Sequence, residues 1–276
     1  MRECARVKPA PFEYAAPDTL DEVLELLAER GDGASVLAGG QSLVPALNLR
    51  ILRPELVVDV NRVSGLDAIS AANGTLRLGA LTRLATLERV ESLPQALRAA
   101  LPHVAHPQIR NRTTIGGSLA HADPAAELPA VVVALGGEIV LASRGGERVV
   151  AAEEFFLGPF TTARRPDELV AEVRLRSGAD HGVFLEFARR RGDFALAGVC
   201  AARTAAGVRI AACGASPVPA LLRGAGEAAA AGEPPDRVGA VAAREVEPWD
   251  DVHATADYRR DLVATLVRRA LEALAR

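Results

Sequence analysis

The chain has 276 residues, a mass of 28.9 kDa and a formal net charge of -3, with a pI near 6.0. This length predicts about two domains. Its 49% hydrophobic and 24% charged residues exclude a largely disordered chain. The mild acidity argues against a nucleic-acid partner, because such proteins usually carry a basic surface.

The N-terminal residues 1–11 lack the apolar core of a signal peptide, and the longest apolar run, residues 128–135, is too short to span a membrane. The cysteines are Cys4, Cys200 and Cys213, with no CxxC pair, so we expect neither a disulfide framework nor an iron–sulfur or zinc site. We interpret them as buried or incidental thiols of a cytoplasmic protein without a membrane span.

The first half of the chain alternates helix and strand signals. A helix is predicted from Leu20 to Arg30, capped by Asp18 or Thr19 and stopped by Gly31. Short apolar runs predict further elements. Strands are expected at 35–38, 56–60, 75–81, 138–142 and 167–175, and helices at 82–90, 93–101 and 128–135.

The pattern breaks at residues 176–181, and the second half reads differently. Strands are expected at 183–187, 195–204 and 207–213, followed by helices at 225–231, 235–244 and 257–275. Strands followed by helices are typical of an α+β domain. We therefore divide the chain into residues 1–176 and 177–276.

Two segments with paired glycines stand out. The first glycine loop is residues 38–43, comprising Ala38, Gly39, Gly40, Gln41, Ser42 and Leu43. The second glycine loop is residues 114–118, comprising Thr114, Ile115, Gly116, Gly117 and Ser118. Glycine permits positive φ and close approach of a ligand, and successive N–H groups can form a nest for an anion. Helices beginning at Gln41 or Leu119 would add their dipoles. Two such loops could hold a pyrophosphate, and the alternative is that each is an ordinary turn.

Longer motifs include both loops. They are AGGQSLVP at 38–45, QIRNRTTIGGS at 108–118, HADPAAELP at 121–129, FFLG at 155–158, RRRGDFA at 189–195 and YRR at 258–260. In this order and spacing the chain resembles the FAD-binding medium subunit of molybdenum hydroxylases, the family of aerobic carbon monoxide dehydrogenase and xanthine dehydrogenase. The resemblance covers nearly the whole chain.

The resemblance implies a two-lobed FAD-binding domain of the vanillyl-alcohol-oxidase (PCMH) type, followed by a smaller α+β C-terminal domain. FAD would lie between the lobes, bound noncovalently, with its pyrophosphate held by the two glycine loops. Glu127 matches an acidic cofactor contact of the family, and backbone near Val104 and near Ala163 or Arg164 lines the site. With His121 as a flavin neighbour, the remaining expected cofactor-binding residues are Val104, His121, Asp123 and Glu127.

The implied function is electron transfer within a heterotrimeric complex. A large molybdopterin-binding subunit and a small [2Fe–2S] subunit would hold the other cofactors, arranged as a dimer of heterotrimers. Electrons would pass through FAD to a quinone, oxygen or NAD, so we expect no general acid or base in this chain. Two alternatives stay open: a self-sufficient FAD-dependent oxidoreductase, and a non-enzymatic nucleotide-binding or assembly module.

One position departs from the family. Relatives often carry a lysine just before the arginine pair, where this chain has Leu185 and Glu186, and Arg189 is a candidate substitute. A basic group there would favour the reduced, anionic flavin, so the flavin potential and the acceptor contact stay open. His103, His106 and His121 do not form a familiar metal-ligand spacing, and we expect no metal site.

Overall fold

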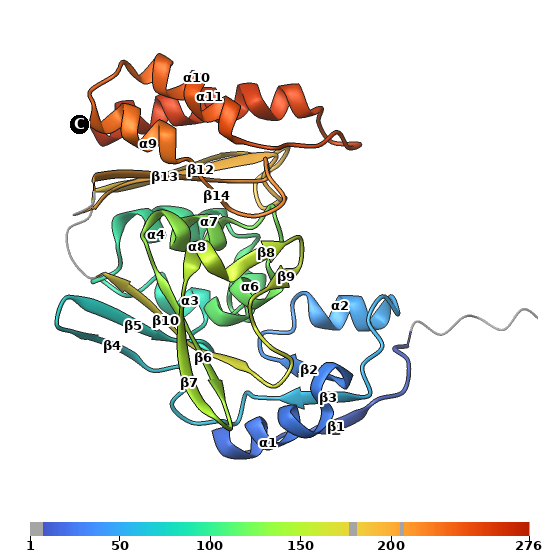
Figure 1. Ribbon diagram of the computed structural model, residues 1–276. Helices are drawn as coiled ribbons and strands as arrows, with labels where there is room; N and C mark the ends of the chain where they lie inside the picture. Colours follow the sequence, from blue (N-terminus) through green and yellow to red (C-terminus); the bar gives the residue numbers. More distant parts are fainter. Residues whose placement is uncertain (1–7, 177–180, 205–206, 276) are drawn as a thin grey trace, which may run out of the picture.

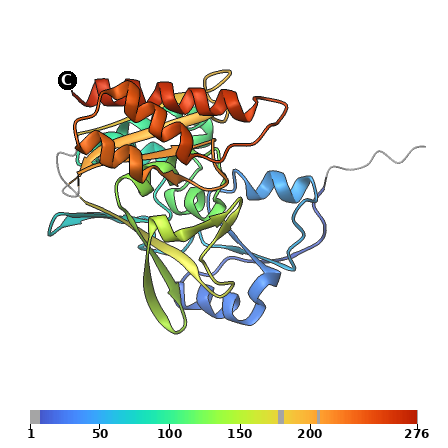
Figure 2. The ribbon, with the colours of Figure 1, turned by 45° about the horizontal axis from the view of Figure 1, so that its top comes forward.

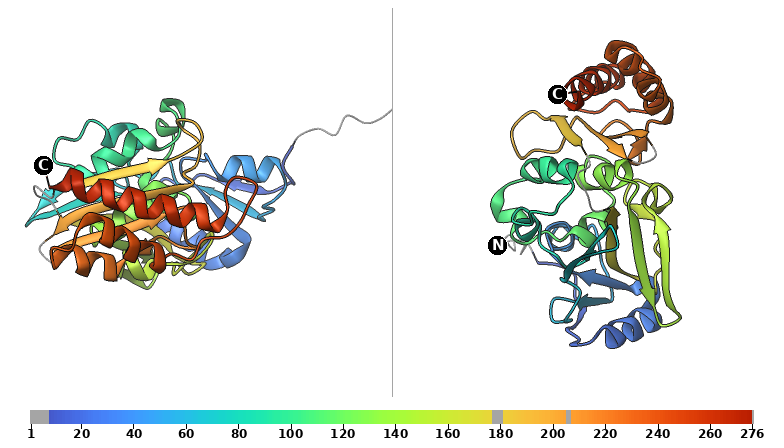
Figure 3. Two further views of the ribbon diagram at one scale, coloured as in Figure 1. Left: turned by 90° about the horizontal axis from the view of Figure 1, so that it is seen from above. Right: turned by 90° about the vertical axis from the view of Figure 1, so that its left-hand side faces the viewer.

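The computed structural model describes residues 8–176, 181–204 and 207–275. Its sheets and helices are stacked in layers, with the N-terminal elements at the bottom of Figure 1 and the C-terminal helices at the top. The same layering is visible from the side in the right-hand view of Figure 3. The mixture of sheets and helices confirms the expected α+β class.

The lowest layer is a three-stranded parallel sheet in the order β1-β3-β2. Its elements are β1 (Glu13–Ala15), α1 (Leu20–Arg30), η1 (Gly31–Gly33), β2 (Ala34–Leu37), α2 (Leu43–Asn48) and β3 (Leu56–Asp59). Helix α1 begins as predicted, because Thr19 and Glu22 form a reciprocal capping box. It buries Val23, Leu24 and Leu27 against this sheet and against Ala142 and Leu169 of the next sheet.

The middle layer is a five-stranded antiparallel sheet in the order β4-β5-β10-β6-β7. Its strands are β4 (Ile69–Ala72), β5 (Thr75–Gly79), β6 (Glu138–Ser143), β7 (Gly146–Ala151) and β10 (Leu169–Arg176). Helices cover the face toward the C-terminal domain. They are α3 (Leu84–Leu87), α4 (Gln95–Ala100), η2 (Leu101–His103), α5 (Pro107–Arg110), α6 (Ile115–His121), α7 (Glu127–Ala134) and α8 (Ala152–Phe155). A short hairpin, β8 (Phe156–Gly158) and β9 (Thr161–Thr162), completes this layer.

The top layer is a four-stranded antiparallel sheet in the order β11-β12-β13-β14. Its elements are β11 (Gly182–Phe187), β12 (Ala197–Thr204), β13 (Gly207–Cys213), β14 (Ala220–Leu221), α9 (Arg223–Ala230), α10 (Pro235–Glu245) and α11 (Ala256–Leu274). The three helices lie across the outer face of the sheet, as the left-hand view of Figure 3 shows. Helices α4 and α7 pack on the inner face.

Strand β12 explains how the top layer joins the middle one. Val199 and Ala201 face α9–α11, whereas Cys200 and Ala202 join the core shared with α4 and α7. Side chains of a strand alternate between faces, and both faces of this strand are buried. One apolar core therefore runs from the middle sheet through α7 into the C-terminal sheet.

Most predicted elements are present, with a few corrections. The helix expected at 82–90 is wrong except for the single turn of α3. Residues 82–84 are instead tied to the second glycine loop, since Ile115 N–H donates to the Thr82 carbonyl and Leu84 N–H to the Thr113 carbonyl. The predicted break includes residues 177–180, which lie outside the described residues, as does Cys4. The boundary between residues 1–176 and 177–276 therefore stays a prediction.

Candidate functional site

The first glycine loop connects the end of β2 to the start of α2. Gly40 has φ +73°, the left-handed conformation that favours glycine. The helix begins at Leu43 and not at Gln41. Within the described part of the chain, no group accepts a hydrogen bond from the backbone N–H groups of residues 39–43. The loop therefore presents a run of unpaired donors, which is the nest expected for an anion.

The second glycine loop is built differently. Helix α6 begins at Ile115, four residues before the expected Leu119, and Thr114 caps it by accepting a hydrogen bond from Gly117 N–H at 3.1 Å. The N–H groups of Ile115 and Gly116 donate to the carbonyls of Thr82 and Ala80. This loop thus uses its N–H groups internally and forms a wall rather than a second nest.

The structure brings the two loops together. A Cβ at Gly39 would lie 2.5 Å from the Arg112 carbonyl oxygen, so only glycine allows this approach. A Cβ at Gly117 would be 3.8 Å from the Ala38 Cβ. In Figures 1 and 2, α2 and α6 lie on the same side of the molecule, consistent with this contact. The glycine pairs are therefore parts of one site.

Asn61 and Arg83, which the sequence analysis does not identify, connect the segments that carry the two glycine loops. Asn61 donates from Nδ2 to the Leu37 and Ala38 carbonyls at 3.3 and 2.9 Å, and its Oδ1 accepts from Arg83. Arg83 also donates to the Arg112 carbonyl. Burial and the nearby Arg112 charge lower the pKa of Arg83. The two guanidinium groups lie near each other and near the Asp59 carboxylate, which offsets part of their positive charge. The only sequence signal was the position of Asn61 just after β3.

The second group of predicted residues lies along α6 and the start of α7. His121 ends α6, and its ring centroid is 5.1 Å from that of Phe160, with its pKa lowered by burial. Asp123 accepts a hydrogen bond from Ala125 N–H at 2.9 Å and lies 4.0 Å from His121 Nε2. Glu127 is the first residue of α7 and only 6% exposed, and burial raises its pKa to about 7.

The backbone at Val104 is fixed by a buried arginine. Arg110 donates to the carbonyls of Val104 and Ala105 at 3.1 and 3.2 Å and pairs with Glu88 at 2.6 Å. Arg110 therefore orients the turn before the second loop, whereas Arg112 is exposed. Of the other backbone segment expected in the site, the Ala163 carbonyl accepts from Arg148 at 2.6 Å.

The remaining candidates do not form a separate site. Arg189, Arg190 and Arg191 are exposed, and Arg189 donates to the His253 carbonyl at 2.7 Å. Cys200 and Cys213 are buried free thiols. Among the described residues there is no cluster of metal-ligating side chains, and no helix is long and apolar enough to cross a membrane.

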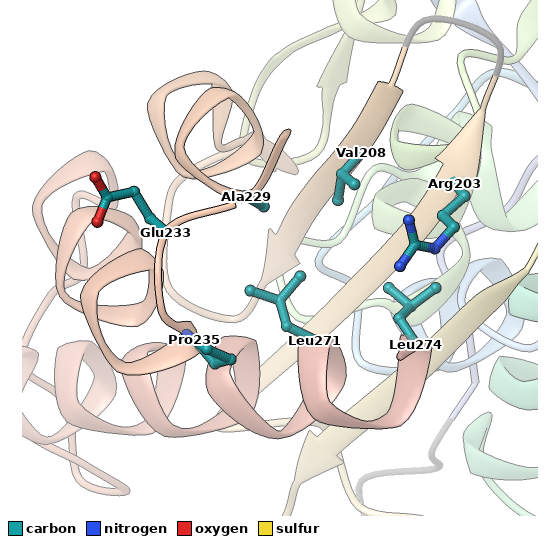
Figure 4. Close-up of a pocket in the computed structure, with 7 residues that line it drawn as sticks. All are labelled: Arg203, Val208, Ala229, Glu233, Pro235, Leu271 and Leu274. Atoms are coloured by element: carbon teal, nitrogen blue, oxygen red, sulfur yellow. The ribbon is translucent and has the colours of Figure 1, made fainter. Parts of the chain in front are cut away.

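A surface pocket elsewhere does not suit a dinucleotide. It lies between β12, β13 and the C-terminal helices, with Arg203, Val208, Glu233 and Leu274 among its lining residues, as Figure 4 shows. Its volume of about 120 Å³ is below the several hundred Å³ typical of ligand sites. The glycine-loop site, with its unpaired donors and close backbone approach, fits the pyrophosphate of FAD better.

Known proteins match the chain from end to end. The model of the family described as FAD binding domain in molybdopterin dehydrogenase matches residues 10–175, and that of the CO dehydrogenase flavoprotein C-terminal domain matches residues 183–274. The 6-hydroxypseudooxynicotine dehydrogenase complex subunit alpha of Paenarthrobacter nicotinovorans is 39% identical, over 96% of this chain and 95% of that protein. The carbon monoxide dehydrogenase medium chain of Hydrogenophaga pseudoflava is 34% identical, over 96% and 97%.

Solved structures agree with this assignment. The chain superposes on carbon monoxide dehydrogenase from Hydrogenophaga pseudoflava with a TM-score of 0.92 at 34% identity, covering 97% of this chain and 98% of that one. For quinoline 2-oxidoreductase from Pseudomonas putida 86 the TM-score is 0.89 at 32% identity, with the same coverage. The chain therefore belongs to the FAD-binding family of the molybdopterin dehydrogenases, and it is an oxidoreductase subunit with FAD as its cofactor.

Proposed function

We propose that the chain is the electron-transfer subunit of a cytoplasmic molybdenum hydroxylase, with its FAD bound noncovalently. In this assembly a large subunit holds the molybdopterin and a small subunit holds the [2Fe–2S] clusters, arranged as a dimer of heterotrimers. The end-to-end match to proteins named as medium chains and complex subunits supports membership of a multi-subunit complex. FAD supplies the redox chemistry when bound, and the protein holds and tunes it.

The observation that carries the proposal is the run of unpaired N–H groups at residues 39–43, pressed against the second glycine loop. These N–H groups bind the pyrophosphate, joined by the hydroxyl of Ser42. Gly116, Gly117 and Ser118 form the opposite wall, and Arg83 and Arg112 supply compensating charge. Val104, His121, Asp123 and Glu127 line the part of the site nearer the flavin ring.

The two buried thiols of the described chain, Cys200 and Cys213, do not form the cysteine set that binds an iron–sulfur cluster. This fits the entry of electrons from a partner subunit. The reduced cofactor then passes electrons to an external acceptor, of which quinone, oxygen and NAD are the candidates. The chain's residues bind and orient the cofactor, and substrate oxidation takes place on the large subunit.

The experiment is to purify the tagged chain with its native complex and measure FAD, iron and molybdenum. A substrate panel of carbon monoxide, an aldehyde, a purine and an N-heterocycle is then added without oxygen. We expect all three cofactor signals, and bleaching of the flavin by at least one substrate. A chain free of iron and molybdenum that oxidises a substrate by itself would instead establish the self-sufficient oxidoreductase.

A further inference from the structure

A buried carboxylate lies at the place where the family resemblance expects a lysine. Glu186 is on β11, and its side chain is only 6% exposed. One oxygen, Oε1, accepts a hydrogen bond from His103 Nδ1 at 3.1 Å. The other oxygen, Oε2, is buried and has no hydrogen-bond partner in the described chain. A buried carboxylate oxygen without a donor is costly, so it calls for an explanation.

A second buried carboxylate belongs to the same neighbourhood. Glu127, at the start of α7, interacts electrostatically with both Glu186 and His103. Burial raises the pKa of the Cys213 thiol on β13, and the charges of both carboxylates raise it further. Each group comes from a different segment, at the junction between the middle and top layers of the fold. We call His103, Glu127 and Glu186 the junction cluster.

The junction cluster contains no permanently charged cation. The other titratable or charged groups facing it are Asp123 before α7, Cys200 and Cys213 on the C-terminal sheet, and Arg191 on the turn after β11. Arg191 acts on His103 as a like charge, and Arg110 is already paired with Glu88. Two carboxylates in a low-dielectric site must therefore be balanced by protons that the cluster itself holds.

The geometry also gives protons a route. The His103 side chain is 39% exposed, while its Nδ1 bonds the buried Glu186. Its ring is held edge-on against Phe184, with centroids 5.5 Å apart. An imidazole that is partly in solvent and bonded through one nitrogen to a buried carboxylate can pass protons between the solvent and that carboxylate. The next residue, Val104, and Glu127 are both proposed to line the flavin end of the site.

We propose that the junction cluster takes up a proton when the bound FAD is reduced, with His103 as the route from solvent. This inference rests on the proposed function. Two electrons arrive from the iron–sulfur clusters of the partner subunit. Bound FAD would accept the two electrons with one proton of its own, and the chain's residues would supply the place for a second proton, which His103 carries from solvent to the carboxylates of the junction cluster.

The test is a redox titration of the FAD-loaded full chain at several pH values between 7 and 8. The slope of the midpoint potential against pH gives the number of protons taken up per two electrons. We expect about two protons for the wild type and about one for Glu186→Gln, which keeps the shape and the His103 contact. The control is Glu172→Gln, since both Glu172 oxygens are held by Arg77 and Arg174 on the middle sheet.

A second readout uses the FAD-free chain. The hydrogen bond that His103 donates to Glu186 raises the pKa of His103, so the NMR titration midpoint of its imidazole should fall in Glu186→Gln. A wild-type slope of one proton, or equal slopes for the wild type and Glu186→Gln, would overturn the inference while leaving FAD binding established. A chain that binds no FAD would overturn the proposed function instead.

Discussion

At the scale of single residues, the proposed cofactor site depends on glycines whose replacement would move backbone. A Cβ at Gly39 would meet the Arg112 carbonyl oxygen at 2.5 Å, and one at Gly116 would meet the Ala80 Cβ at 2.4 Å. Both contacts are with groups that cannot easily shift. These glycines set the distance between the loops and between α6 and the middle sheet.

Gly40 offers a test with a matched control. Its φ of +73° disfavours valine, and a Cβ there would lie 3.0 Å from Leu37 Cδ1, so Gly40→Val should distort the run of unpaired N–H groups and abolish FAD binding. Gly74 has φ +72° with open space around it, so Gly74→Val has a similar backbone cost of about 1–2 kcal/mol and should keep its FAD. Calorimetric titration of both variants with FAD makes the comparison. Normal FAD affinity in a folded Gly40→Val chain would remove the first glycine loop from the site.

Glu127 gives a prediction about pH and stability. Burial, reinforced by the charge of Glu186, raises its pKa from 4.5 to about 7, so the folded chain holds this proton to higher pH than the unfolded chain. Stability should therefore fall as the pH rises from 4.5 to about 7, and the full penalty of about 3 kcal/mol is present above that range. Glu127→Gln should make the FAD-free chain more stable at pH 8 and leave it unchanged at pH 4.5.

Urea unfolding at the two pH values checks this. Glu168 serves as the control, because its pKa is shifted in the opposite direction. Arg148 holds it in an ion pair at 2.6 Å, and this lowers its pKa in spite of burial. Glu168→Gln should destabilise the chain at pH 8. A Glu127→Gln variant with the wild-type pH dependence would show that Glu127 is ionised in the folded chain at neutral pH.

Sequence reasoning found the glycines and Glu127 but not Asn61, Arg83 or the partners of Glu186. Paired glycines leave a signal because their conformational role is local. Asn61 and Arg83 act on carbonyls far away in the sequence, and a polar residue after a strand is usually only part of a turn. Their role depends on how the loops meet, which no local pattern encodes.

At the scale of elements, one buried arginine connects α11 to the C-terminal sheet. Arg259 is 3% exposed and donates to the carbonyls of Leu196 and Gly214, each at 2.7 Å. It also bonds Asp251 at 2.6 Å and stacks over the Trp249 ring at 5.0 Å. Because Gly214 N–H donates to the Pro124 carbonyl, this arginine indirectly supports the segment that leads to Glu127.

Replacement of Arg259 should be severe. Arg259→Leu leaves the carbonyls and Asp251 without their donor, and we expect a loss of about 3–5 kcal/mol in the free energy of unfolding. Its neighbour Arg260 is partly exposed, and among the described residues its one ion-pair partner is Asp257, so Arg260→Leu should change stability by about 0.5 kcal/mol or less. Denaturant unfolding of the two variants measures the difference, and equal stabilities would contradict the bridging role.

The elements that the sequence predicted are those with a strong local signal. Helices α1, α7 and α11 have caps or long apolar patterns, and β12 and β13 are mostly apolar. Strands β1 and β4 are short and largely exposed, so nothing in their composition separates them from loops. The helix expected at 82–90 failed because pairing with the second glycine loop competes with helix formation there.

At the scale of the whole molecule, the layers place one site where several segments meet. The first glycine loop comes from the bottom layer, and the second loop and Glu127 come from the middle layer. Glu186 comes from the top layer, whose sheet shares its core with α4 and α7. The FAD site and the junction cluster are therefore products of the folded chain as a whole. The order of the motifs allowed the sequence to predict this family and fold, although not the contacts between layers.

We propose above all that this chain binds FAD, with the first glycine loop holding its pyrophosphate. The most direct measurement is the visible absorption spectrum of the purified chain, with mass spectrometry of the cofactor released by heat. We predict a yellow protein that releases intact FAD at close to one molecule per chain. A colourless chain that also fails to take up added FAD would contradict the account, because the unpaired N–H groups would then have no pyrophosphate to bind.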